Sequence, residues 1–231
     1  MKLPQVMFHI KEIKMKKAVV ILSGGMDSTT LLYDLYNQGY DLEAISFNYD
    51  QKHQKELICA TATCKKLGIK HKIIDLRILG QLAPSALTRE NVKIPEGSYT
   101  NDSMKLTVVP NRNMVMLSLA ASYAIGSDIT DIFYGAHAGD HAIYPDCRIE
   151  FVEAMKTMFK LCDWKKINLN APYLKIDKAE IARIGKKLNV DYNLTWTCYK
   201  GGKKACGKCG SCTERLEAFA KAGMKDPVQY K

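Results

Sequence analysis

Residues 23–28, with the sequence SGGMDS, form a short polar loop directly after the first strongly apolar run of the chain. Glycine lets a backbone approach a phosphate group closely, and the free N–H groups at the start of a helix attract its charge. The loop lacks the lysine that reaches the β and γ phosphates in loops of the G-x-x-x-x-G-K-[ST] type. It therefore predicts a cradle for a pyrophosphate leaving group, as in the transfer of AMP to a carboxyl or carbonyl oxygen.

Four cysteines near the C-terminus have the spacing of a metal site. Cys198, Cys206, Cys209 and Cys212 form the pattern C-x7-C-x2-C-x2-C, with glycines between them that permit tight turns. Thiolates at this spacing can converge on one tetrahedral ion, which predicts zinc. An iron–sulfur cluster is the alternative, because C-x2-C-x2-C also occurs in cluster-binding proteins. Four thiolates would fill the coordination shell of zinc, so the predicted role is structural.

The remaining cysteines carry weaker signals. Cys59, Cys64 and Cys162 lie in or beside predicted helices and are interpreted as small apolar side chains. Cys147 lies in the sequence YPDCR, where a loop could present a nucleophile. Amide formation through an acyl-adenylate needs no covalent enzyme intermediate, so the catalytic interpretation of Cys147 is the less favoured one.

The elements that must position these groups alternate between strand and helix. Strands are expected at residues 18–22, 42–47, 70–76, 129–135 and 167–171, where apolar and β-branched residues are concentrated. Helices are expected at residues 29–38, 51–67, 113–125, 150–161 and 177–188, where apolar residues recur at helical spacing. The alternation predicts an α/β fold with a doubly wound, mainly parallel sheet, which binds ligands at the carboxyl ends of its strands.

Two further signals refine this outline. Asp177 and Glu180 have the spacing of a capping box at the start of the last predicted helix. Residues 77–110 are rich in Pro, Ser, Gly and Asn and are expected to be an irregular connection. A connection of that length in a compact domain usually has a function.

The composition is that of one folded domain. The chain has 231 residues, 47% of them hydrophobic, which favours a single domain over residues 15–231 with the cysteine segment 198–212 as a small appendage. Residues 1–14 are interpreted as an N-terminal extension. No apolar stretch reaches the roughly 20 residues that span a bilayer, and no signal-peptide pattern is present, so we expect a soluble, cytoplasmic protein. The net charge of +10 is spread along the chain, which argues against a nucleic-acid partner.

A series of motifs along the chain resembles the motifs of a known family. In order, the chain contains SGGMDSTT, FNYDQKH, LAPSALTRE, VPNRN, YPDCR, DKAEI, LTWTCYKGG and CGKCGSCTERLEAF. The first resembles the pyrophosphate loop of the ATP pyrophosphatase superfamily, which includes GMP synthetase and NAD synthetase. Together the motifs resemble the 7-cyano-7-deazaguanine synthase family over almost the whole chain after residue 15.

This resemblance implies a carbon–nitrogen ligase that uses ATP and magnesium. Its substrates would be 7-carboxy-7-deazaguanine and ammonia, and its product the 7-nitrile, a precursor of queuosine. Adenylating the carboxylate turns one of its oxygens into a leaving group, so ammonia can form the amide. The same activation of the amide oxygen would then yield the nitrile. The resemblance also implies one structural zinc ion per chain and a homodimer.

The resemblance further implies roles for individual residues. Asp27 would orient magnesium or phosphate, Lys178 would neutralise charge on the α phosphate, and Arg112 would hold the substrate carboxylate. The expected ATP-binding residues are Ser23, Gly24, Gly25, Asp27, Ser28 and Phe47. The expected substrate-binding residues are Arg112, Asn113, Asp140, His141, Tyr144, Asp146 and Arg148.

Two departures from the family pattern leave alternatives open. Asn48 replaces the aspartate of the family's F-D-Y-G-Q-R-H element, and residues 140–143 replace its D-[YF]-S-G element. A related enzyme that stops at the 7-amide is therefore one alternative. A tRNA-modifying enzyme of the same superfamily is another, although no separate RNA-binding domain is evident.

Overall fold

The computed structural model describes residues 15–52, 54–89, 91–97 and 102–231, so the predicted N-terminal extension lies outside the described residues. A five-stranded sheet has the order β3-β2-β1-β4-β5, and all neighbouring strands are parallel. The strands are β1 (Lys17–Ile21), β2 (Asp41–Asn48), β3 (Lys70–Asp75), β4 (Asp131–Phe133) and β5 (Asn168–Asn170). The strand order reverses beside β1, so the predicted doubly wound sheet is confirmed.

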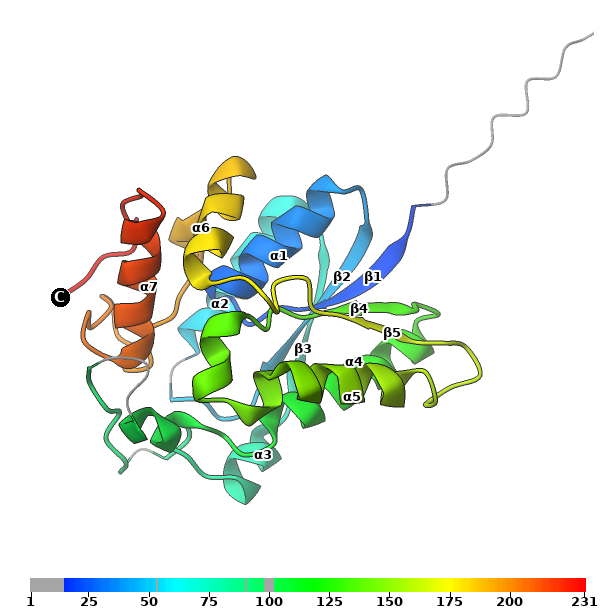
Figure 1. Cartoon of the computed structure of the whole chain (residues 1–231), viewed down its shortest axis with the longest axis horizontal. Coiled ribbons are helices and arrows are strands. Elements are labelled where there is room, and N and C mark those ends of the chain that lie inside the picture. Colours follow the sequence, from blue (N-terminus) through cyan, green and yellow to red (C-terminus); the bar gives the residue numbers. More distant parts are fainter. Residues whose placement is uncertain (1–14, 53, 90, 98–101) are drawn as a thin grey trace, which may run out of the picture.

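Helices cover both faces of the sheet (Figure 1). They are α1 (Met26–Asn37), α2 (Lys55–Leu67), α3 (Arg77–Leu82), α4 (Arg112–Gly126), α5 (Ile149–Phe159), α6 (Lys178–Lys187) and α7 (Gly210–Lys221). Ala18 and Val20 of β1 belong to one core cluster with residues of α1, α2 and α6, whereas Val19 belongs to a second cluster with residues of α4 and α5. Successive strand side chains point to opposite faces, so β1 must be apolar throughout its centre.

Three segments differ from the sequence-based expectation. The connection at residues 77–110 is not wholly irregular, because it contains α3 and the 3-10 helix η1 (Asp102–Thr107). The strand expected at residues 129–135 is reduced to β4, because the chain leaves the sheet there to line a cavity. Helix α7 was not predicted at all. The remaining 3-10 helices are η2 (Ala138–Ala142), η3 (Pro145–Cys147) and η4 (Tyr192–Leu194).

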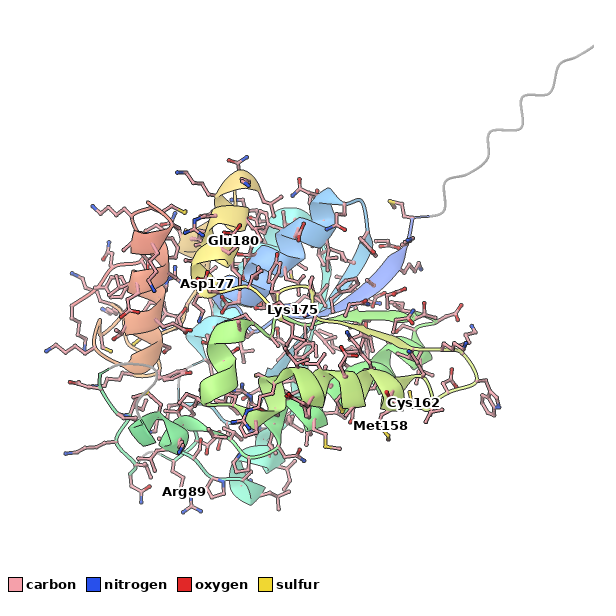
Figure 2. All side chains as sticks on the ribbon, in the orientation of Figure 1. Arg89, Met158, Cys162, Lys175, Asp177 and Glu180 are labelled. Atoms are coloured by element: carbon pink, nitrogen blue, oxygen red, sulfur yellow. The ribbon has the colours of Figure 1, made fainter. Side chains whose placement is uncertain are left out.

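Helix α6 begins with the cap that the sequence predicts. The Asp177 carboxylate accepts a hydrogen bond from the backbone N–H of Glu180 at 2.8 Å, and both residues lie at the start of α6 (Figure 2). The Glu180 carboxylate instead accepts a hydrogen bond from Arg183 at 2.7 Å. The cap fixes where α6 starts, and therefore where its first residue, Lys178, enters the interior.

A buried ion pair fixes the C-terminal segment to α7. Arg215 donates from Nε to Asp226 Oδ2 at 2.7 Å and from Nη2 to Asp226 Oδ1 at 2.9 Å, and the two side chains are 1% and 2% exposed. Arg215 Nη1 also donates to Thr195 Oγ1 at 2.9 Å, and the Tyr230 hydroxyl donates to Asp226 at 2.5 Å. These contacts join α7, the segment after η4 and the C-terminus.

Removing one charge of this pair should destabilise the fold strongly. In Asp226→Asn the Arg215 guanidinium stays buried without its counter-charge, so we expect the free energy of unfolding to fall by about 3–5 kcal/mol. Denaturant titration followed by circular dichroism measures the change. Glu217→Gln, an exposed change on the same helix, is the control and should leave the midpoint nearly unchanged. Equal midpoints for the two variants would contradict this account.

Candidate active site

A cavity of about 220 Å³ opens at the carboxyl ends of β1, β2 and β4. Ser23 follows β1, Phe47 lies near the end of β2, and Tyr134 follows β4, and all three line the cavity. The reversal of strand order beside β1 makes the loops after β1 and β4 diverge, which leaves room for a ligand between them. The cavity therefore occupies the position that the sequence analysis expects for a ligand site.

The SGGMDS loop is held in shape by its own serines. Ser23 N donates to Ser28 Oγ at 3.1 Å, the two serine hydroxyls are 2.9 Å apart, and Gly25 N donates to Ser23 Oγ at 3.2 Å. Helix α1 begins directly after Gly25, and no side chain caps its N-terminus. The first N–H groups of α1 are thus left for a ligand, and their partial positive charge favours an anion.

Gly24 serves the packing of the loop rather than the cavity wall. Its φ of +89° is a conformation that favours glycine, and a Cβ atom there would lie 2.0 Å from the carbonyl oxygen of Glu56. Gly24 is not among the residues that line the cavity, whereas Ser23, Gly25, Asp27 and Ser28 are. The glycine therefore lets the loop approach the first turn of α2.

Lys178 lies between two carboxylates at the cavity. Its Nζ is 2.5 Å from Glu214 Oε2 and 3.4 Å from Asp27 Oδ2, and only 8% of its side chain is exposed. Burial alone would lower the pKa of Lys178, but the charges of Asp27 and Glu214 raise it above its usual value. Lys178 is therefore a fixed positive charge beside the phosphate loop.

His137 joins this group although the sequence analysis did not select it. Its ring is buried, and Nδ1 accepts a hydrogen bond from the backbone N–H of Gly139 at 3.1 Å. The other ring nitrogen, Nε2, is 3.4 Å from Asp140 Oδ2 and 3.8 Å from Asp27 Oδ2. His137 therefore places a buried imidazole between two carboxylates that line the cavity.

Two glutamates that line the cavity were also missed. Glu214 is the partner of Lys178, and burial raises its pKa while the Lys178 charge opposes that shift. Glu56 lies in the first turn of α2, where burial raises its pKa to about 7 against the opposing charges of Arg112 and Lys178. Neither glutamate belongs to a local sequence pattern that points to a ligand, so only the fold reveals them.

Arg112 lines the cavity among aromatic rings. Its Cζ is 5.8 Å from the ring centroids of both Tyr49 and Tyr144, and Nη1 is 3.5 Å from the Tyr49 hydroxyl. Tyr144 and Tyr199 share a hydrogen bond of 3.0 Å between their hydroxyls, and both line the cavity. A cation flanked by flat apolar faces suits a planar anionic ligand.

The predicted substrate-binding residues divide into two groups. Arg112, Asn113, Asp140 and Tyr144 line the cavity, as does the predicted adenine neighbour Phe47. Asp146 and Arg148 do not line it. The side chain of His141 lies outside the part of the chain that the structure describes.

Asp146 instead supports the start of α4. Its Oδ2 accepts a hydrogen bond from Asn113 N at 2.9 Å, and its carbonyl oxygen accepts one from Asn113 Nδ2 at 3.2 Å. Arg148 is exposed and lines a second, more open cavity together with Arg89 and Lys105. The YPDCR segment therefore contributes Tyr144 and Cys147 to the main cavity and Arg148 to the second cavity.

Cys147 has the environment of a protonated thiol. Asn113 Nδ2 donates to its sulfur at 3.1 Å. Burial, together with the negative charges of Asp140 and Asp146, raises the pKa of Cys147 well above its usual value. Since the thiolate is the nucleophilic form, this position does not favour covalent catalysis by Cys147.

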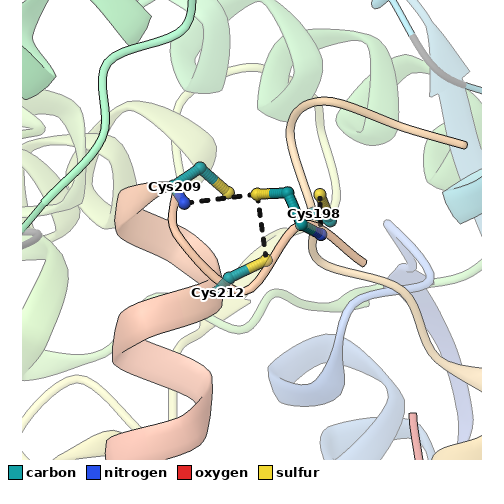
Figure 3. Close-up of side chains that lie close together, drawn as sticks. Cys198, Cys209 and Cys212 are labelled. Carbon is teal, nitrogen blue, oxygen red and sulfur yellow. Dashed lines mark hydrogen bonds between the residues drawn. The ribbon is translucent and has the colours of Figure 1, made fainter. Parts of the chain in front are cut away.

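The four C-terminal cysteines converge as their spacing predicts. All four are buried, and their sulfur atoms lie within 4.8 Å of one another. Figure 3 shows the side chains of Cys198, Cys209 and Cys212 pointing toward one another. The sulfurs of Cys206 and Cys212 are 3.9 Å apart, and Cys206 Sγ accepts hydrogen bonds from the backbone N–H groups of Lys208 and Cys209 at 3.4 and 3.3 Å. Sulfurs on a zinc ion at about 2.3 Å are separated by similar distances, so this donor set fits a tetrahedral metal.

No helix in the described ranges has both the length and the apolar character needed to cross a membrane. Two solved structures share the fold at 16% sequence identity. A 4-thiouridine synthetase in complex with RNA and ATP matches with a TM-score of 0.53 over 90% of this chain and 50% of that one. A predicted tRNA methyltransferase subunit from Methanocaldococcus jannaschii matches with a TM-score of 0.50 over 94% and 93%.

Comparison of sequences identifies the family, which the shared fold alone does not. Proteins named 7-cyano-7-deazaguanine synthase from Caldicellulosiruptor saccharolyticus and Methanoregula boonei are 63% and 64% identical to this chain over 214 residues. The aligned region is 93% of this chain and 95% and 99% of those relatives. The model of the family described as queuosine biosynthesis protein QueC matches residues 17–223. The extent of this match and the high identity of these full-length relatives show that the chain belongs to the QueC family.

Proposed function

We propose that the protein converts 7-carboxy-7-deazaguanine, ammonia and ATP into 7-cyano-7-deazaguanine. The relatives with 60–64% identity carry the name of this synthase. The observation that carries the proposal is that the lysine-free SGGMDS loop and Arg112 line the same cavity. The loop fits a pyrophosphate leaving group, and Arg112 fits the carboxylate that must be activated.

The reaction begins with attack of a substrate carboxylate oxygen on the α phosphorus of ATP. The new O–P bond displaces pyrophosphate, which the N–H groups at the start of α1 and the hydroxyls of Ser23 and Ser28 would hold. Lys178 would offset the charge that develops on the α phosphate during this step. Ammonia then attacks the acyl carbon, and AMP leaves with the electron pair of the broken C–O bond.

The second stage removes the remaining oxygen. The amide oxygen attacks the α phosphorus of a second ATP and displaces pyrophosphate. Breaking the C–O bond then releases AMP, and loss of the two N–H protons leaves the nitrile. A neutral amide is a weaker nucleophile than a carboxylate, so this stage requires tighter orientation of the heterocycle. Asp140 and the Oδ1 atom of Asn113 would accept hydrogen bonds from its polar edge, and Tyr144 would contact its flat face.

Two metals fit the residues that are present. Zinc fits the four buried cysteines, where it would hold the segment that precedes α7. Magnesium fits near Asp27, because Oδ1 of this carboxylate is buried and has no hydrogen-bond partner among the described residues. A magnesium ion bound with ATP would supply positive charge to the phosphates.

We also propose a homodimer. Three apolar side chains near the end of α5, Met158, Leu161 and Trp164, are 57%, 75% and 102% exposed. An exposed apolar surface of this kind supports contact with a second copy of the chain.

The first test concerns the nucleotide products. Wild-type protein with 7-carboxy-7-deazaguanine and ammonia should release AMP and pyrophosphate. Asp27→Asn should slow this release by roughly a hundredfold or more, because it removes the carboxylate that we propose as a magnesium ligand and that lies 3.4 Å from Lys178. Asp34→Asn, on the same helix but outside the cavity, is the matched control. Release of ADP and phosphate as the primary products would contradict the assignment of the loop.

The second test concerns the cysteine site. Metal analysis of purified protein should give about one zinc ion per chain. Cys209→Ser should lose the metal and lower the thermal unfolding midpoint, because metal-binding energy contributes to folding. Cys162→Ser, which changes an exposed cysteine outside the cluster, should do neither. A visible iron–sulfur absorption band in anaerobically prepared protein would overturn the zinc assignment.

The third test concerns the end product. Wild-type protein should complete the nitrile, whereas Asp140→Asn should accumulate the 7-amide, because the second activation depends more on the orientation of the heterocycle. Mass spectrometry of the product separates the two compounds. If the wild-type protein stops at the amide with ATP and ammonia in excess, the enzyme is an amide synthase. If Asp140→Asn yields only nitrile at a lower rate, Asp140 has no special role in the second stage.

A further inference from the structure

The four-cysteine segment forms one wall of the cavity. Thr197 and Tyr199 flank Cys198, and both line the cavity. Ser211 directly precedes Cys212 and lines the cavity as well. A segment interpreted from its sequence as a structural appendage thus contributes directly to the site.

Helix α7 links the cysteine cluster to the cavity most directly. Cys212 and Glu214 lie in its first two turns, two residues apart. Residues two apart on a helix point in directions that differ by about 200°. One rigid turn can therefore present the Cys212 sulfur to the cysteine cluster and the Glu214 carboxylate to the cavity, and both placements are observed.

The Glu214 carboxylate is held from two sides. Its Oε2 is 2.5 Å from Lys178 Nζ, which is closer than the 3.4 Å between Lys178 and Asp27. Its Oε1 lies against η2, since a Cβ atom at Gly139 would be 2.9 Å from this oxygen. Of the two carboxylates beside the Lys178 ammonium group, Glu214 is therefore the closer one.

We infer that Glu214 is a positioning residue that holds Lys178 for the reaction, and that the four-cysteine segment sets the position of Glu214. The inference rests on the role proposed above for Lys178. Metal binding at the cysteines then supports catalysis as well as folding. Loss of the metal would release the start of α7 and with it the carboxylate that orients Lys178.

A double-mutant cycle tests whether Glu214 acts through Lys178. Glu214→Gln keeps the shape of the side chain and removes its charge. We expect it to lower kcat for AMP release by roughly 10–100-fold and to change KM for ATP by less than about threefold, because a misplaced Lys178 affects the transition state more than binding. In a Lys178→Gln background, where no ammonium group remains to be positioned, Glu214→Gln should have little further effect.

A second measurement does not depend on turnover. Glu214 favours the charged form of Lys178, so Glu214→Gln should increase the fraction of neutral amine. An amine-selective reagent labels the neutral amine of Lys178, and mass spectrometry measures the rate. This rate should rise about tenfold for each unit by which the pKa of Lys178 falls. Removal of the metal from the wild-type protein by a chelator should increase labelling in the same direction.

Glu217→Gln is the matched control, because Glu217 lies on the same helix but is exposed. It should leave kcat, labelling and thermal stability unchanged. The inference is overturned if Glu214→Gln behaves like Glu217→Gln, if it lowers kcat equally in both Lys178 backgrounds, or if it lowers only the thermal midpoint. Unchanged Lys178 labelling after metal removal would overturn the link to the cysteines. Failure of the wild-type protein to release AMP would instead refute the proposed function, and the labelling experiment would still decide the inference.

Discussion

A single buried ammonium group must balance the carboxylates that surround it, and the arrangement of the site follows from that constraint. Lys178 lies beside Asp27 and Glu214, and His137 lies between Asp27 and Asp140. Two carboxylates thus share the charge of Lys178, so cations that accompany a polyphosphate would reduce its repulsion by this end of the site. The strand order beside β1 brings the starts of α1 and α6 together, and the cysteine segment adds α7. Helices α1, α6 and α7, which are far apart in the sequence, thus begin close to the Lys178 ammonium group.

Close backbone packing is the second requirement of this site. Gly24 approaches the first turn of α2, and a Cβ atom at Gly135 would lie 3.3 Å from the backbone of Ser28. The loops after β1 and β4 are therefore positioned by main-chain contacts. Such contacts can adjust less than contacts made by long, flexible side chains. Such packing pre-organises the cradle, so little order has to be gained when phosphate binds.

The features that could be predicted from the sequence are those that depend on residues close together in the chain. Strand and helix periodicity gave the parallel sheet, and the cysteine spacing gave the converging thiols. His137, Glu56 and Glu214 were missed because their importance arises only when separate elements pack together. The surroundings of Asp146 were unpredictable for a related reason: a carboxylate in a loop can face a ligand or accept from a helix N–H group, and here it accepts from Asn113. Helix α7 was missed because the glycines and cysteines at its start obscure the helical pattern.

The connection between β3 and α4 has a consequence for how such enzymes can diverge. It crosses from an edge of the sheet to the cavity, where the Thr107 hydroxyl lies 3.2 Å from that of Tyr144. Leu79, Leu87 and Met104 of this connection are buried in the same core cluster as Val19 of β1, so the connection is packed against the sheet along its length. The SGGMDS loop is positioned separately, by β1 and α1. A substitution in this connection can therefore change the surroundings of Tyr144 while the shape of the SGGMDS loop is preserved.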